Sequence, residues 1–231
     1  MTTKYKHLFF DLNRTLWDFE TNSIQAFKEI FKKRNLSEIF PDFDTFVKTY
    51  KHHNEKLWEL YRLGQIKKDE LRNDRFLLTL KDFNCDDMDL ATTIGDDYVE
   101  LSPQQTTLFP GTIETLEYLA PKYKMHIITN GFVEVQYKKL RNSNLEKYFD
   151  KIITSEEAKA SKPKPGIFHA ALSSANAKKS ECLMIGDDLK NDIIGARDYG
   201  FDQVFFNPHK NEHQEKVSYE VESIPALREI L

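Results

Sequence analysis

Four positions along the chain carry side chains whose types and spacing could do chemistry: Asp11, Thr129, Lys162 and Asp187. Three of them follow a short apolar run within two residues, which is typical of a buried strand that ends at a loop. In an open parallel sheet, ligands bind just past the carboxyl ends of the strands. At such an edge, carboxylates can bind a hard cation, and an amine can neutralise the charge of an anionic group.

The ordered set resembles the four motifs of the haloacid dehalogenase (HAD) superfamily, whose phosphatases use an aspartate nucleophile. Asp11 and Thr15 match the first motif, Asp-x-Asp-x-Thr, and the other three positions match the later motifs in order. Four motifs in the right order across nearly the whole chain are highly specific. The sequence departs from the family at one motif position, because Asn13 replaces the second Asp.

The resemblance implies a role for each matched residue. Asp11 attacks phosphorus and forms an aspartyl-phosphate, which divides one difficult displacement into two easier ones. Thr129 donates its hydroxyl to a phosphate oxygen, together with the backbone N–H of Asn130. Lys162 neutralises charge on the nucleophile and on the transferring group. The family pattern Lys-Pro-x-Pro selects Lys162 over its neighbour Lys164.

The family also implies Mg²⁺, a cation that prefers one or two carboxylates, water and substrate phosphate as ligands. Asp11 and Asp187 would supply the carboxylates, and the backbone carbonyl of Asn13 would be a further ligand. Asp188 and Asp192 are both candidates for a second ligand or a supporting group, and we favour Asp192.

Asn13 affects the expected rate. The family's second Asp protonates the leaving oxygen and then deprotonates the attacking water, whereas an amide cannot exchange a proton in this way. Losing such help costs about 10²–10⁴ in rate. We therefore expect slow turnover, from either an engineered Asp-to-Asn change or a natural drift to a weak phosphatase. The intact remaining motifs favour engineering.

Strand and helix patterns alternate along the chain after residue 107, which predicts an α/β core with a Rossmann-like, doubly wound parallel sheet. Residues 1–16 and 107–231 form this predicted core. After Thr15 the pattern is helical for roughly 90 residues, far too many for a loop, so we predict an all-helical cap over residues 17–106. In the family such a cap covers the active site. The expected elements after it include a strand at Lys151–Thr154 and a helix at Asn191–Tyr199.

Substrate choice is expected from the cap and from the loop after Thr15. The candidate aromatic residues are Trp17, Phe19, Trp58 and Tyr61, since aromatic faces can stack a nucleobase. For each of them, packing in the core of a four-helix bundle is the competing interpretation.

A finer resemblance concerns the helical-cap phosphatases that include pyrimidine nucleotide 5′-phosphatases, which act on nucleoside monophosphates. It rests on the stretches 128–132, 155–157 and 162–168 and on Gln136 and Leu140. All of these are predicted core residues, so they indicate the branch better than the substrate.

Composition narrows the class of protein. The formal net charge is −4 over 231 residues, which argues against the basic face that a nucleic-acid polymer requires. The sequence has no apolar run long enough to span a membrane and only two cysteines. We expect a cytoplasmic protein without a disulfide framework. The oligomeric state is not readable from the sequence.

The sequence therefore predicts a Mg²⁺-dependent phosphomonoesterase whose partner is a small phosphorylated metabolite, with a nucleoside monophosphate of the pyrimidine type as the favoured substrate. Rivals within the superfamily are a sugar-phosphate phosphatase and a pyrophosphatase. A rival of another class is a non-catalytic protein that binds phosphorylated metabolites and has Asn13 as its native residue. A dehalogenase is disfavoured because it would not need Asp187 as a metal ligand.

Overall fold

The computed structural model describes residues 4–231 and divides the chain into two compact units. One unit contains the chain up to Phe19 and again from Thr106 to Leu231, and the other contains Glu20–Gln105. The division predicted from the sequence fell at 16/17 and 106/107, within three residues of these boundaries.

The first unit is built on a six-stranded sheet in which every pairing is parallel. The strand order is β3-β2-β1-β4-β5-β6, so β1 lies inside the sheet between β2 and β4. The α/β fold class predicted from the sequence is confirmed. The strands are β1 (His7–Phe10), β2 (Lys124–Thr129), β3 (Lys151–Thr154), β4 (Cys182–Gly186), β5 (Asp202–Phe206) and β6 (Tyr219–Val221).

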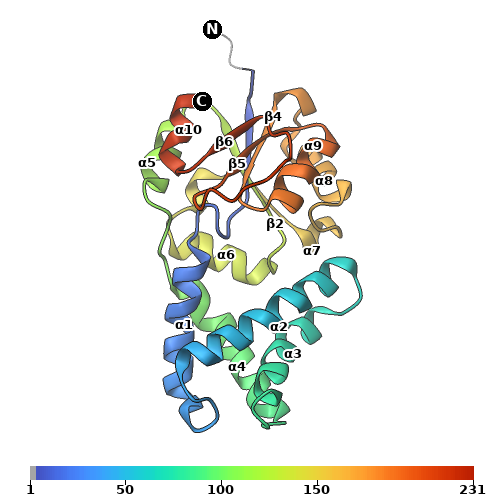
Figure 1. The fold of residues 1–231 in the computed structure, drawn as a ribbon. Helices are drawn as coiled ribbons and strands as arrows, with labels where there is room; N and C mark the ends of the chain where they lie inside the picture. The colour runs from blue at the N-terminus through green and yellow to red at the C-terminus, as the bar shows by residue number, and fades with distance from the viewer. Residues whose placement is uncertain (1–3) are drawn as a thin grey trace. The chain divides into compact units, whose positions relative to one another are not determined.

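Helices cover both faces of this sheet (Figure 1). Leu8 and Phe10 face one side, where they pack in a cluster with Leu116 and Leu227, and Phe9 faces the other side with Phe168. This division follows from the two-residue period of a strand. The part of this unit from Thr106 to Leu231 contains the α-helices α5 (Thr112–Leu119), α6 (Val133–Asn142), α7 (Ser155–Ala158), α8 (Pro165–Ala175), α9 (Gly195–Tyr199) and α10 (Leu227–Ile230).

The second unit is helical, with a core of its own formed by apolar and aromatic side chains at helical spacing. Asp42 accepts the N–H of Thr45 at the start of its longest helix, and Gly64 ends that helix with a φ of 76°. Its helices are α1 (Phe19–Lys33, which begins in the first unit), α2 (Phe43–Leu63), α3 (Lys68–Lys81) and α4 (Met88–Leu101).

The predicted helix Asn191–Tyr199 begins differently in the structure. Residues Leu189–Ile194 form one wide π-helical turn, and α9 follows it. Such turns are found frequently at functional sites. This one carries Asp192, whose carboxylate turns back toward the sheet and accepts the backbone N–H of Asp188 (3.1 Å).

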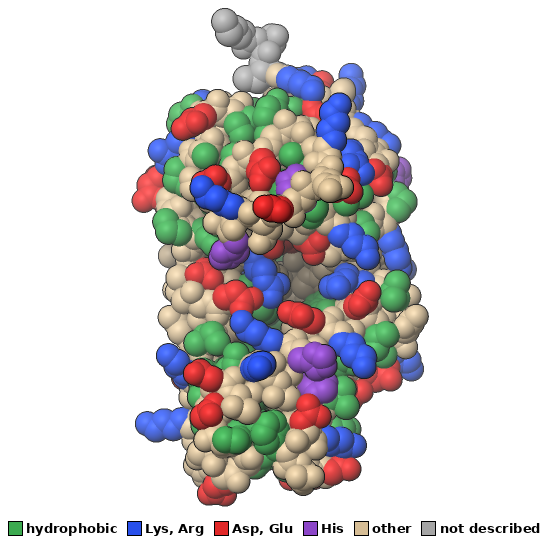
Figure 2. Space-filling view, viewed as in Figure 1, with side chains coloured by type: hydrophobic (Ala, Val, Ile, Leu, Met, Phe, Trp, Pro, Cys, Tyr) green, Lys and Arg blue, Asp and Glu red, His purple; other side chains and the backbone are tan. Residues whose placement is uncertain are grey.

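Charged side chains of both signs are interspersed over the face of each unit in view (Figure 2). This agrees with the small net charge of −4. Within residues 4–231, none of the helices has the length and the apolar character needed to cross a bilayer.

Candidate active site

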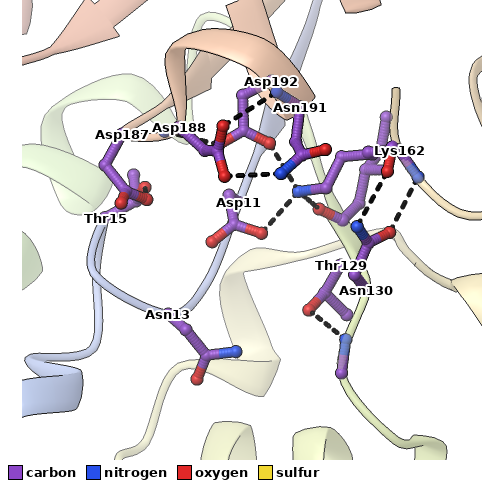
Figure 3. Close-up of polar contacts among 12 residues, drawn as sticks. Asp11, Asn13, Thr15, Thr129, Asn130, Lys162, Asp187, Asp188, Asn191 and Asp192 are labelled. Atoms are coloured by element: carbon purple, nitrogen blue, oxygen red, sulfur yellow. Dashed lines mark hydrogen bonds and ion pairs between the residues drawn. The ribbon is translucent and has the colours of Figure 1, made fainter. Parts of the chain in front are cut away.

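The candidate site lies just past the carboxyl ends of β1, β2 and β4. Asp11 directly follows β1, and its backbone N–H donates to the carbonyl of Ile185 on β4 (2.9 Å). Thr129 is the last residue of β2, and Asp187 directly follows β4. Because neighbouring parallel strands end at the same edge, residues that are far apart in the sequence meet here (Figure 3).

Lys162 joins these strand ends. Its side chain is buried, and its Nζ donates to Asp11 Oδ1 (2.5 Å) and to the carbonyl of Ile128 on β2 (2.7 Å). The same Nζ lies 2.7 Å from Asp192 Oδ1. Burial alone would lower the pKa of Lys162, but the carboxylates of Asp11 and Asp192 raise it above its usual value. The side chain is therefore a fixed positive charge beside Asp11.

Three carboxylates lie close together here, and two of them, Asp11 and Asp192, contact the Lys162 ammonium. One oxygen from each of Asp11, Asp187 and Asp192 lies within 4.8 Å of the others. Burial and the charge of Asp11 raise the pKa of Asp187 to about 7. Burial also raises the pKa of Asp192 well above its usual value, although Lys162 opposes this. One ammonium does not balance three carboxylates, and these oxygen donors are of the kind that Mg²⁺ prefers, so the residues present fit a divalent cation.

The geometry gives different roles to Asp188 and Asp192, the two candidates for a second metal ligand or a supporting group. Asp188 Oδ1 accepts the N–H groups of Lys190 and Asn191, so this carboxylate caps the π-helical turn. Asp192 instead points at Lys162 and approaches Gly186 so closely that a Cβ at 186 would lie 2.3 Å from its Oδ2. Its Oδ1 faces the ammonium and its Oδ2 accepts a backbone N–H, which suits a supporting group for the cation site.

The loop after β2 is tied to the Lys162 loop. The Asn130 side chain donates to the backbone carbonyl of Lys162 (3.0 Å) and accepts its N–H (2.8 Å). Thr129 is buried, and its Oγ1 accepts the N–H of Gly131 (3.2 Å). Thr129 and Lys162, both predicted to bind phosphate, are thus held by one network.

Thr15 and Arg14 follow the nucleophile position. Thr15 is buried and donates its hydroxyl to Asp187 Oδ1 (2.9 Å), which agrees with the bracing role expected for it. Arg14, for which the sequence suggested no role, has a φ of 62°. Its guanidinium lies 4.2 Å from the centroid of the Phe19 ring, and its charge lowers the pKa of Asp187 against the larger effect of burial.

Asn13 contacts two residues of α6. Its Nδ2 donates to Gln136 Oε1 (3.2 Å), and its Oδ1 accepts from Lys139 Nζ (2.7 Å). Sequence reasoning used Gln136 only as a mark of the family branch and did not use Lys139. The available signal was their spacing of three residues on a helix that begins just after Thr129.

The four candidate specificity residues differ in exposure. Trp17 is fully buried in the core of the first unit, which favours packing over contact with a leaving group. Phe19 is half-buried and meets Trp17 edge to face, with ring centroids 6.2 Å apart. Trp58 and Tyr61 on α2 are also half-buried and form a second edge-to-face pair at 5.7 Å.

Known proteins are similar to this chain in sequence and in fold. Pyrimidine 5′-nucleotidase PynA of Streptococcus pneumoniae is 32% identical over 232 residues, which covers 98% of this chain and 95% of that protein. Pyrimidine 5′-nucleotidase YjjG of Escherichia coli is 29% identical, with coverages of 99% and 98%. The crystal structure of the HAD-hydrolase YfnB from Bacillus subtilis bound to magnesium superposes with a TM-score of 0.90, at 27% identity and 99% coverage of both chains.

The family model for haloacid dehalogenase-like hydrolases matches residues 5–200. This range contains Asp11, Thr129, Lys162 and Asp187, which the fold brings to one edge of the sheet, and it confirms the resemblance inferred from the motifs. A match over this share of the sequence, with full-length relatives beside it, means that the chain belongs to the haloacid dehalogenase-like hydrolase family.

Proposed function

We propose that this protein is a Mg²⁺-dependent phosphomonoesterase that acts through an aspartyl-phosphate. One observation carries the proposal: Asp11 lies 2.5 Å from a buried ammonium on one side and belongs to a three-carboxylate cluster on the other. A carboxylate can attack an anionic phosphoryl group only where negative charge is neutralised. Lys162 neutralises charge at Asp11 directly, and a divalent cation held by the three carboxylates would neutralise more.

The first step joins an oxygen of Asp11 to phosphorus and breaks the bond to the leaving oxygen. Lys162 and the Thr129 hydroxyl are placed to stabilise the charge on the transferring group. In the second step, water attacks phosphorus, the bond to Asp11 breaks, and inorganic phosphate leaves. Asn13 can donate a hydrogen bond to the leaving oxygen but cannot supply the proton, so water must supply it and turnover is slow.

Asp11 and Asp187 would hold the Mg²⁺ with their carboxylates and Asn13 with its backbone carbonyl, while Asp192 supports them through Lys162. When bound, the cation neutralises charge on the carboxylates and on the phosphate, and it orients the phosphate for attack. The raised pKa of Asp187 supports this assignment, because a buried carboxylate beside other carboxylates is relieved by a cation.

For the substrate, we propose a pyrimidine nucleoside monophosphate. The support comes from two full-length relatives, PynA and YjjG, which are pyrimidine 5′-nucleotidases. The half-buried Trp58 and Tyr61 are the aromatic side chains that we assign to base selection. If so, Trp58→Ala changes the ranking among nucleotides and leaves the rate with acetyl phosphate, which has no base, nearly unchanged.

The test is phosphate release from purified protein with pyrimidine and purine nucleoside monophosphates, sugar phosphates and pyrophosphate. The chain is compared with Asn13→Asp, which restores a proton carrier, and with Asp11→Asn, which removes the nucleophile. Higher kcat/KM for pyrimidine nucleotides than for the other classes supports the proposal. A preference for sugar phosphates or pyrophosphate would contradict the proposed substrate. If no variant released phosphate, the chain would be a phosphate-binding protein without catalytic activity.

A further inference from the structure

The side chain of Asn13 is held from two sides by one helix. Lys139 Nζ lies 2.7 Å from its Oδ1, and Gln136 Oε1 lies 3.2 Å from its Nδ2. Both residues of α6 are only 3% exposed. Asn13, two residues after Asp11, is therefore held by two buried polar side chains that are more than 120 positions away in the sequence.

The contact with Lys139 decides which way the amide faces. An ammonium can donate hydrogen bonds but cannot accept one, so the Asn13 atom beside it must be the oxygen. The amide nitrogen then faces Gln136, which must turn its own oxygen toward it. One of the two N–H groups on Asn13 Nδ2 makes this bond, and the amide has a second N–H with which to donate to another acceptor.

Each holding residue is itself fixed. Gln136 packs against Gly131 in the phosphate-side loop, where an added Cβ would lie 2.1 Å from Gln136 Nε2. Lys139 Nζ lies 3.5 Å from the centroid of the Trp17 ring, a cation–π contact that fixes the ammonium. Residues 136 and 139 share one face of α6 because three residues make nearly one helical turn. The helix thus connects the Thr129 loop to Asn13.

We propose that Gln136 and Lys139 are positioning residues for Asn13, which fix its amide so that the second N–H meets the leaving oxygen. The Lys139 charge also polarises the amide, which strengthens Nδ2 as a hydrogen-bond donor. This inference rests on the proposed phosphatase function and extends it: with no proton carrier at position 13, the leaving oxygen is stabilised by an oriented hydrogen bond.

Kinetics test the proposal with two substrates that differ in their need for help at the leaving oxygen. A nucleoside monophosphate has a poor alkoxide leaving group, and a nitrophenyl phosphate has a good one. Lys139→Met should lower kcat for the nucleotide about tenfold more than for the aryl phosphate, the effect of one lost hydrogen bond. KM should change little for either substrate, since phosphate is bound by other residues.

Matched variants separate positioning from folding. Lys139→Arg keeps a buried cation and should restore most of the nucleotide rate. Gln136→Glu keeps the acceptor for Asn13 Nδ2, whereas Gln136→Met removes it. Lys138→Met, at the neighbouring position on α6, should change neither rate. An equal loss for both substrates in Lys139→Met, without rescue by Lys139→Arg, would overturn the proposal.

A second measurement does not depend on turnover. The side-chain amide of Asn13 gives a pair of ¹H–¹⁵N signals that Asn13→Asp removes, which assigns them. Lys139→Met should move both signals toward those of a free amide, whereas Lys139→Arg and Lys138→Met should leave them in place. If no variant releases phosphate but these shifts appear, the proposed function fails and the positioning of Asn13 stands. Unchanged signals in Lys139→Met would contradict the positioning itself.

Discussion

Strands β1 and β2 bury polar groups at two places, and the two places differ in their partners. Past the carboxyl ends of these strands, Lys162 lies against Asp11 and Asp192. Nearer their beginnings, His7 and His126 form a buried pair, with Nδ1 of one 3.0 Å from Nε2 of the other. Their rings are stacked at 5.3 Å, and the His126 ring lies 4.8 Å from that of Phe9.

The two places show that burial alone does not decide whether a group is charged. Burial, together with His7, lowers the pKa of His126 to about 4, so this pair is neutral at pH 7. Lys162 is also buried but stays charged because carboxylates contact it. In these two strands the buried charge therefore lies at the edge that carries the candidate site, and the neutral pair belongs to the packing of the sheet.

The largest expected effect comes from Lys162→Met, which replaces the buried ammonium with a side chain that is uncharged, as the histidine pair is. It removes the charge beside Asp11 and should lower kcat about 10³-fold in the Asn13→Asp background, as the loss of a preorganised charge-stabilising group does. Phosphate release measures it. Lys164→Met, at an exposed position two residues away, is the matched control. A larger loss in the control would mean that the motif is assigned two residues off.

Asp187→Asn should lower Mg²⁺ affinity by at least about 10²-fold, since removing even an outer partner of a metal ligand costs 10- to 100-fold. Calorimetry with Mg²⁺ alone measures this without substrate. Asp188→Asn is the control: it leaves the π-helical turn capped by an amide and should keep the affinity nearly unchanged. Equal affinity in the chain and in Asp187→Asn would remove this residue from the metal site.

Asn13→Asp should raise phosphatase activity by about 10²-fold, because a carboxyl group can give and take the proton that an amide cannot. The measurement is kcat with a nucleoside monophosphate at saturating Mg²⁺. Asp11→Asn combined with Asn13→Asp should be inactive. Equal rates for the unsubstituted chain and for Asn13→Asp would show that proton transfer at this position does not limit turnover.

The smallest effect concerns the histidine pair and pH. The pKa of His126 is about 4 in the folded protein and 6.5 when exposed. Below pH 6.5, His126 therefore binds a proton in the unfolded chain but stays neutral in the folded protein. This contribution to stability is complete above pH 6.5 and is lost as the pH falls toward 4. Between pH 7.5 and 5 the free energy of unfolding should drop by about 2 kcal/mol on this account.

Urea unfolding at the two pH values measures this drop, and His126→Leu should reduce it, whatever the variant does to the stability at pH 7.5. The variant keeps an apolar side chain at a fully buried position. An identical pH dependence in both proteins would show that His126 does not titrate differently in the folded and unfolded states. Phosphatase rates at pH 7.5 should remain within a few-fold, because the histidines do not contact the site.

The sequence alone determined the fold class and the four motif residues that meet at one edge of the sheet. Apolar runs that end in Asp11, Thr129 and Asp187 predict strands, and parallel strands must end at a common edge. The order of the motifs identified the family before any geometry was known. These predictions succeed because they depend on local periodicity and on residue type, both of which are written directly in the chain.

Only the tertiary structure decided how those residues are held. It showed that Asp188 caps a turn while Asp192 pairs with Lys162, a choice that their spacing left open. It also brought Lys139 to Asn13 across 126 positions and buried Trp17 beneath that lysine. Such contacts depend on the side-chain directions of elements that meet only after the sheet has formed, and no local pattern in the sequence records those directions.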